Sequence, residues 1–123
     1  MKSYKKIIPL DIFHRGVAVV FGSRDTLVDC MKGYGYKNAL TNRIEDALNT
    51  SEAVVLRLDE DAIIYIEHKV TEGVLIHEIV HAASHILGLV DIDNEEMLSY
   101  LMQYLYEQIV PWARTTHYIL EQQ

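Results

Sequence analysis

The chain has 123 residues, enough for one domain with a hydrophobic core but too few for two comparable ones. Half of the residues are hydrophobic and 24% are charged, a balance typical of a globular protein. The net charge of −7 argues against nucleic acid as a partner, because no basic face is available to neutralise phosphates, and the single cysteine excludes a disulfide within the chain.

The apolar runs of the sequence are short. The basic N-terminal stretch is interrupted by Pro9 and Asp11, so it lacks the apolar core of a signal peptide. No run approaches the roughly 18 consecutive apolar residues that a membrane-spanning helix needs. The composition therefore predicts a single domain, residues 1–123, that is cytoplasmic and does not use a membrane.

The first predicted elements are a strand and a short helix. Residues 16–22, GVAVVFG, are rich in β-branched side chains and bounded by glycines, as a strand would be. Ser23 or Asp25 is a suitable N-cap for a helix that ends near Gly33. One or two further helical turns are expected within residues 41–52.

Two more strands are expected on either side of an acidic turn. They are residues 53–58, AVVLRL, and residues 62–68, AIIYIEH. In the second run, alternation predicts Ile64 on one face of the sheet and Tyr65 on the other. This second strand is either internal or an edge whose backbone can pair with an extended peptide.

Two helices follow these strands. Thr71 is a suitable N-cap for a helix that ends at Gly88, and Asn94 for a helix from Glu95 to about residue 110. Pro111 is expected to break or kink the last helix, because proline has no backbone N–H to donate. This order of elements predicts an α+β fold, with a short, mostly antiparallel sheet followed by a motif helix and a long C-terminal helix.

The most informative motif is HEIVH, residues 77–81, on the first of these two helices. Side chains four apart on a helix differ by about 40° in direction and about 6 Å in height, so His77 and His81 can converge on one cation. Neutral imidazole nitrogen suits zinc, which keeps a water in an open position at catalytic sites. The spacing therefore indicates a Zn²⁺ site in which Glu78 acts as general base on a water whose pKa the metal lowers.

The same histidines also have a plainer interpretation, as polar side chains of a helical core that holds no metal. The flanks of the motif are apolar, which predicts a buried helix. Buried polar side chains need partners, and a metal supplies one, so the surroundings of the motif favour the metal site.

A third histidine, His85, lies one turn beyond His81. It is about 12 Å along the helix axis from His77, so one ion cannot easily take all three rings. Only the pair His77 and His81 brackets Glu78, and this pair is preferred. His85 is then expected beside the site, at the rim of a pocket or bonded to a carboxylate.

A third protein ligand must come from another element. Glu95 and Glu96 begin the last helix, which can fold back along the motif helix, and the apolar periodicity of that helix favours Glu95. Acidic residues in a first helical turn are also common without any metal. Tyr100, one turn after Glu96, is the candidate for stabilising the oxyanion of a tetrahedral intermediate, with packing as the alternative role.

The segments HEIVHAASHILG and DNEEMLSYLMQYL resemble small phage and prophage proteins of the zincin-like, gluzincin-type class. In these proteins, HExxHA precedes the pattern N-[EQ]-E-A-x-A-Y-L. The resemblance implies that His77 and His81 bind the metal and that Glu78 is the general base. It also implies that Glu96, four residues before Tyr100, is the third metal ligand.

The chain departs from this pattern at Met97 and Leu98, where small residues are usual, and at His85, where an apolar or aromatic residue is common. The expected function is that of a zinc metallopeptidase or related hydrolase acting on a peptide or protein substrate. The alternative is a zincin-like binding or regulatory module of phage type without catalysis. Fold resemblance alone does not separate the two.

Overall fold

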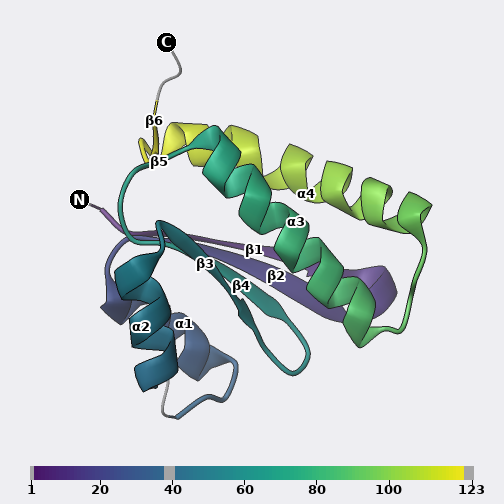
Figure 1. Ribbon diagram of the computed structural model, residues 1–123, viewed down its shortest axis with the longest axis horizontal. Helices are drawn as coiled ribbons and strands as arrows, with labels where there is room; N and C mark the ends of the chain where they lie inside the picture. Colours follow the sequence, from purple (N-terminus) through teal and green to yellow (C-terminus); the bar gives the residue numbers. More distant parts are fainter. Residues whose placement is uncertain (1, 38–40, 121–123) are drawn as a thin grey trace.

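The computed structural model describes residues 2–37 and 41–120, and its centre is a mixed four-stranded sheet (Figure 1). The strands are β1 (Tyr4–Leu10), β2 (Arg15–Phe21), β3 (Ala53–Arg57) and β4 (Ala62–Ile66), in the spatial order β1-β2-β4-β3. β1 is antiparallel to β2 and β3 is antiparallel to β4, whereas β2 and β4 are parallel. β1 and β3 are therefore the edge strands of this sheet.

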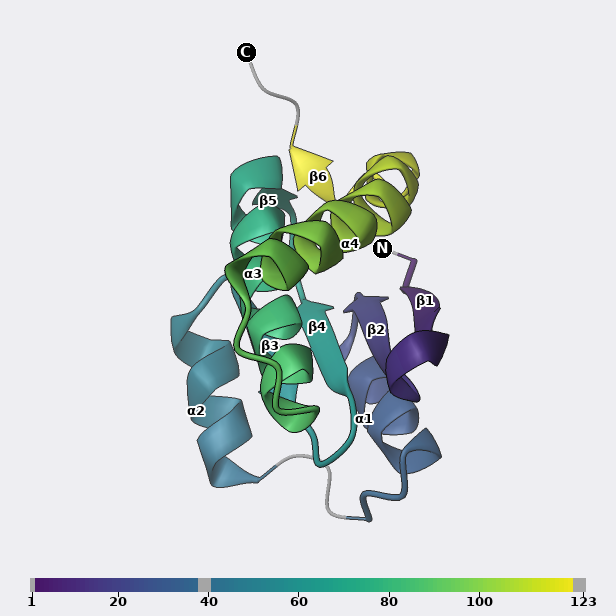
Figure 2. The same ribbon diagram turned by 90° about the vertical axis from the view of Figure 1, so that its right-hand side faces the viewer.

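Helices cover both faces of the sheet (Figures 1 and 2). α1 (Arg24–Gly33) and α2 (Asn42–Thr50) pack on one face, and α3 (Glu72–Leu89) and α4 (Glu95–Thr115) pack on the other. This arrangement confirms the predicted α+β class, with a mixed sheet whose two hairpins are antiparallel.

Three short elements complete the described residues. The 3-10 turn η1 (Asp11–Phe13) joins β1 to β2, and β5 (Val70–Thr71) pairs in parallel with β6 (Ile119–Leu120) beside the start of α3. Over the ranges that the structure describes, no helix combines the length and the apolarity needed to cross a membrane.

β4 is one of the two inner strands of the sheet and is buried on both faces. Ile64 and Ile66 contribute to the core beneath α3 and α4, whereas Ile63 and Tyr65 contribute to the core beneath α1 and α2, as alternation predicted. Because β4 pairs with β2 on one side and β3 on the other, its backbone has no free edge. Of the two interpretations of this strand, the internal one is confirmed, and the free edges of the sheet belong to β1 and β3.

The predicted helix starts are confirmed by their caps. The side-chain oxygens of Ser23, Thr71 and Asn94 each accept a hydrogen bond from the backbone N–H three residues later. Each cap satisfies one of the amide groups that a helix leaves free at its first turn. Thr71 thereby sets where α3 begins, and the position of the motif on that helix follows.

Of the two outcomes expected at Pro111, a break or a kink, the break is wrong, because α4 continues through this residue to Thr115. Pro111 itself is exposed, on the side of α4 away from the core. The neighbouring Val110 and Ala113 are fully buried in the core that α3 and α4 share with the sheet. Their burial favours the helical path on both sides of the proline.

Candidate functional site

The HExxH motif lies in the middle of α3, which packs across β3 and β4 (Figure 1). The apolar side of the helix, including Ile79, Ala82 and Ile86, is buried against the sheet. Of the motif residues that carry chemistry, His77 is exposed, His81 is half-buried and Glu78 is buried. The motif therefore sits at the boundary between the core and an open cleft.

The two imidazoles of the motif face each other at close range. The Nε2 atoms of His77 and His81 are 3.0 Å apart, and the ring centroids are 4.6 Å apart with the planes at 78°. A tetrahedral zinc ion with Zn–N distances of about 2.0–2.1 Å holds two nitrogens about 3.3 Å apart. The nitrogens are thus placed as two ligands of one cation would be, and without a cation one ring donates a hydrogen bond to the other.

Glu78 is 9% exposed and borders the same cleft as His81. Burial raises the pKa of the Glu78 carboxyl above its ordinary value of 4.5, and His81, His77 and Arg57 oppose part of the rise. The Glu78 carboxylate is therefore affected both by the histidine pair and by the mostly apolar side chains that bury it.

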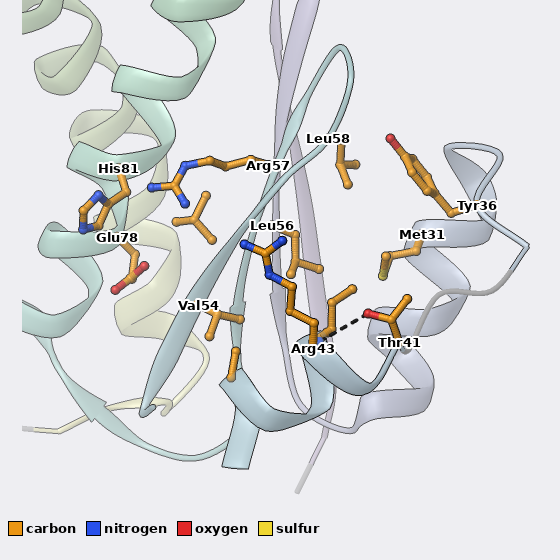
Figure 3. Close-up of a pocket in the computed structure, with 13 residues that line it drawn as sticks. Met31, Tyr36, Thr41, Arg43, Val54, Leu56, Arg57, Leu58, Glu78 and His81 are labelled. Atoms are coloured by element: carbon orange, nitrogen blue, oxygen red, sulfur yellow. Dashed lines mark hydrogen bonds between the residues drawn. The ribbon is translucent and has the colours of Figure 1, made fainter. Parts of the chain in front are cut away.

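The cleft has a volume of about 660 Å³ and follows the free edge of β3, between α3 and α2 (Figure 3). Val55 and Arg57 line it from the face of the strand that α3 covers, and Val54 and Leu56 from the opposite face. The backbone of an edge strand carries N–H and C=O groups without a partner strand. The cleft therefore presents unpaired backbone next to Glu78 and His81.

The two candidates for a third metal ligand lie elsewhere. Glu95 and Glu96 are both exposed in the first turn of α4. Glu95 borders a separate pocket with Ser84 and Leu87, near the end of α3. The α3–α4 turn therefore places the start of α4 beside the last turns of α3, beyond the histidine pair.

Across residues 2–37 and 41–120, no group of three His, Cys, Asp or Glu side chains is arranged to hold a metal ion. The histidine pair fits two ligand positions, and Glu96 is not brought to it. The third ligand implied by the resemblance stays a prediction.

Tyr100, the candidate oxyanion stabiliser, is 61% exposed on α4. It lines a surface pocket with Ile12, Phe13 and Tyr104, on the side of α4 that faces η1. The described structure does not bring Tyr100 to the cleft that holds Glu78, and its expected role also stays a prediction.

His85 contacts the backbone of the turn between β3 and β4. Its Nε2 atom lies 2.8 Å from the carbonyl oxygen of Leu58 and 3.1 Å from that of Asp61, in the turn between β3 and β4. Two carbonyl acceptors require the proton to be on this nitrogen. His85 is thus next to the site, as expected, but it is bonded to backbone carbonyls instead of a carboxylate.

Two arginines of the cleft, Arg43 on α2 and Arg57 on β3, were not among the residues singled out from the sequence. Arg57 is the one charged residue in the run AVVLRL, and alternation places it on the same face as Val55. That pattern is a usable signal, but it says nothing about which helix covers the face. The position of Arg43 depends on how α2 packs and has no local signal.

Comparison of the chain with protein families, with curated proteins and with solved structures finds no match.

Proposed function

We propose that this protein is a metal-dependent hydrolase of zincin-like type that cleaves peptide bonds in the cleft along β3. The observation that carries the proposal is the convergence of two imidazole nitrogens, 3.0 Å apart, beside a buried carboxylate at the wall of this cleft. His77 and His81 would hold the metal, and the resemblance supplies Glu96 as the proposed third ligand. When bound, zinc would lower the pKa of a water and polarise a substrate carbonyl.

Glu78 would act as the general base. Glu78 and His81 line the same cleft from α3. The Glu78 carboxylate would therefore accept a proton from a water held between Glu78 and the metal site. It would then donate that proton to the leaving amine. Its burial excludes most of the bulk water that would compete for the carboxylate.

A peptide is the substrate class that the cleft suits best. An extended chain can pair with the unpaired backbone of β3, as an added strand of the sheet. Such a strand would lie between α3 and α2 and would pass Glu78 and His81, which line the cleft. The aliphatic side chains of β3 and α2 would contact its apolar residues.

The test uses Glu78→Gln, which keeps the shape of the side chain but removes the base. Zinc content is measured by metal analysis after purification without chelators, and hydrolysis is measured by mass spectrometry on a mixture of synthetic peptides. We expect near-stoichiometric zinc in both proteins and a loss of cleavage of at least about 100-fold in the variant. His81→Ala is expected to lose the zinc.

Two results would count against the proposal. Absence of zinc binding at micromolar concentrations would remove the metal site. Full zinc occupancy without cleavage of any peptide would leave the site in place but favour the non-catalytic binding module.

A further inference from the structure

The cleft along β3 carries positive charge, although the whole chain has a net charge of −7. Arg43 and Arg57 line it, and both side chains are exposed. The ion pairs found within the described residues join other groups: Arg24 and His68 with Glu67, and Arg114 with Glu72. Both guanidinium groups of the cleft are thus available to a ligand.

The two arginines enter the cleft from different elements, Arg57 from β3 and Arg43 from α2. Figure 3 shows Arg57 extending from β3 toward Glu78 and His81 on α3, and Arg43 extending from α2 toward β3. Arg57 and Glu78 both line the cleft, on β3 and α3 respectively. An extended chain bound along β3 would therefore lie between the two cations.

The charges inside the cleft do not cancel. Glu78 is the one acidic side chain among the described residues that line it, against two guanidinium groups. Guanidinium binds carboxylate through two parallel N–H···O hydrogen bonds and is only weakly hydrated. The remaining wall is largely aliphatic, with Ile44 and Val54 among its residues, so an anion there would have few competing polar partners.

We propose that this cleft selects peptides that carry a carboxylate, and that Arg57, with Arg43, is the group that recognises it. This inference rests on the proposed function, because it takes the ligand of the cleft to be a peptide. The carboxylate is that of an Asp or Glu side chain, or that of the C-terminus of the substrate. Both present the same planar anion to the arginines.

The test measures binding instead of cleavage, so that it is separate from catalysis. The zinc-loaded Glu78→Gln protein is immobilised, and octapeptide libraries are passed over it in which one position at a time is fixed as Glu or as Gln. The same libraries are made with a free and with an amidated C-terminus. We expect at least one position at which Glu is enriched about 10-fold over Gln, or a 10-fold preference for the free C-terminus.

The arginine variants are made in the same Glu78→Gln background. Arg57→Gln is expected to reduce the preference to below about 3-fold, and Arg57→Lys to restore part of it, since lysine keeps the charge but not the planar fork. Arg43→Gln is a second, independent variant with a smaller expected loss. Lys5→Gln, which removes the same charge from the exposed side of edge strand β1, should leave the preference unchanged.

Equal enrichment of Glu and Gln at every position, with no terminal preference, would overturn the inference, as would a preference that survives in both arginine variants. A phosphoserine library enriched above the Glu library would overturn the choice of carboxylate. Acid selectivity without any hydrolysis by the wild type would count against the hydrolase proposal and leave this inference standing.

Discussion

His85 shows how one side chain can connect two elements near a site without taking part in its chemistry. Its Nε2 group donates toward the carbonyl oxygens of Leu58 and Asp61, which close the turn between β3 and β4. His85 lies on α3 one turn after His81. The contact therefore holds the edge strand of the cleft against the helix that carries the motif.

His85→Ala is expected to lower the free energy of unfolding by about 1–2 kcal/mol, because the half-buried carbonyls lose their donor. Zinc affinity should change little, since this ring is not part of the histidine pair. Urea unfolding and zinc titration measure the two effects. His81→Ala is the matched control, with the opposite pattern expected. A His85→Ala protein of normal stability that cannot bind zinc would make His85 a ligand.

At the scale of elements, Glu72 and Arg114 join the beginning of α3 to the end of α4. The Glu72 carboxylate accepts hydrogen bonds from the Arg114 guanidinium at 2.8 and 3.1 Å and from the hydroxyl of Tyr106 at 3.4 Å. The hydrogen bond from Arg114 lowers the pKa of Glu72 below its ordinary value of 4.5, although burial opposes the shift. A lowered pKa means that folding favours the ionised form.

This pair predicts a specific pH dependence. The stability that Glu72 contributes is present above its unfolded-state pKa and is lost as the pH falls through the lower folded-state pKa. Glu72→Gln should therefore be less stable than the wild type at pH 7, and the difference should shrink as the pH falls below about 4.5. Urea unfolding across this range measures it. A constant difference between Glu72→Gln and the wild type across this range would contradict the assignment.

The elements that the sequence did not predict have identifiable reasons. β1 was missed because its run, YKKIIPL, contains two lysines and a proline. These residues suit an edge strand, where one row of backbone groups faces solvent and charge or proline prevents unwanted pairing. The opposite error at Pro111 arose because local propensity was outweighed by burial of the residues around it.

At the scale of the whole molecule, the sheet separates two hydrophobic cores, one beneath α3 and α4 and the other beneath α1 and α2. The cleft depends on both cores, because one of its walls comes from α3 and the other from α2. Residues separated by more than 30 positions in sequence, such as Arg43 and His81, border the same space. The arrangement of the site thus depends on the packing of both layers.

Leu105→Ala is expected to destabilise the fold by about 2–5 kcal/mol, because Leu105 is fully buried between α4 and the sheet and its loss leaves a cavity. Denaturant unfolding measures the change. The adjacent Tyr104 is 42% exposed, so Tyr104→Ala should have a much smaller effect. Equal effects for the two variants would contradict the packing of α4 described above.

The sequence by itself determined the class of fold, the helix starts at Thr71 and Asn94, and the pairing of His77 with His81. These features are local: a cap acts within one turn, and the spacing of four residues sets the direction of two imidazoles on any α-helix. The resemblance to zincin-like proteins likewise rests on short motifs on two adjacent helices.

Only the tertiary structure decided which groups from other elements meet that histidine pair. It placed the edge of β3, Arg57 and Arg43 at the cleft. It left Glu96 and Tyr100 exposed on α4, which contributes no residue to the lining of the cleft. These positions depend on the α3–α4 turn, the strand order and the packing of helices on each face. They follow from contacts between residues distant in sequence, and no local pattern encodes such contacts.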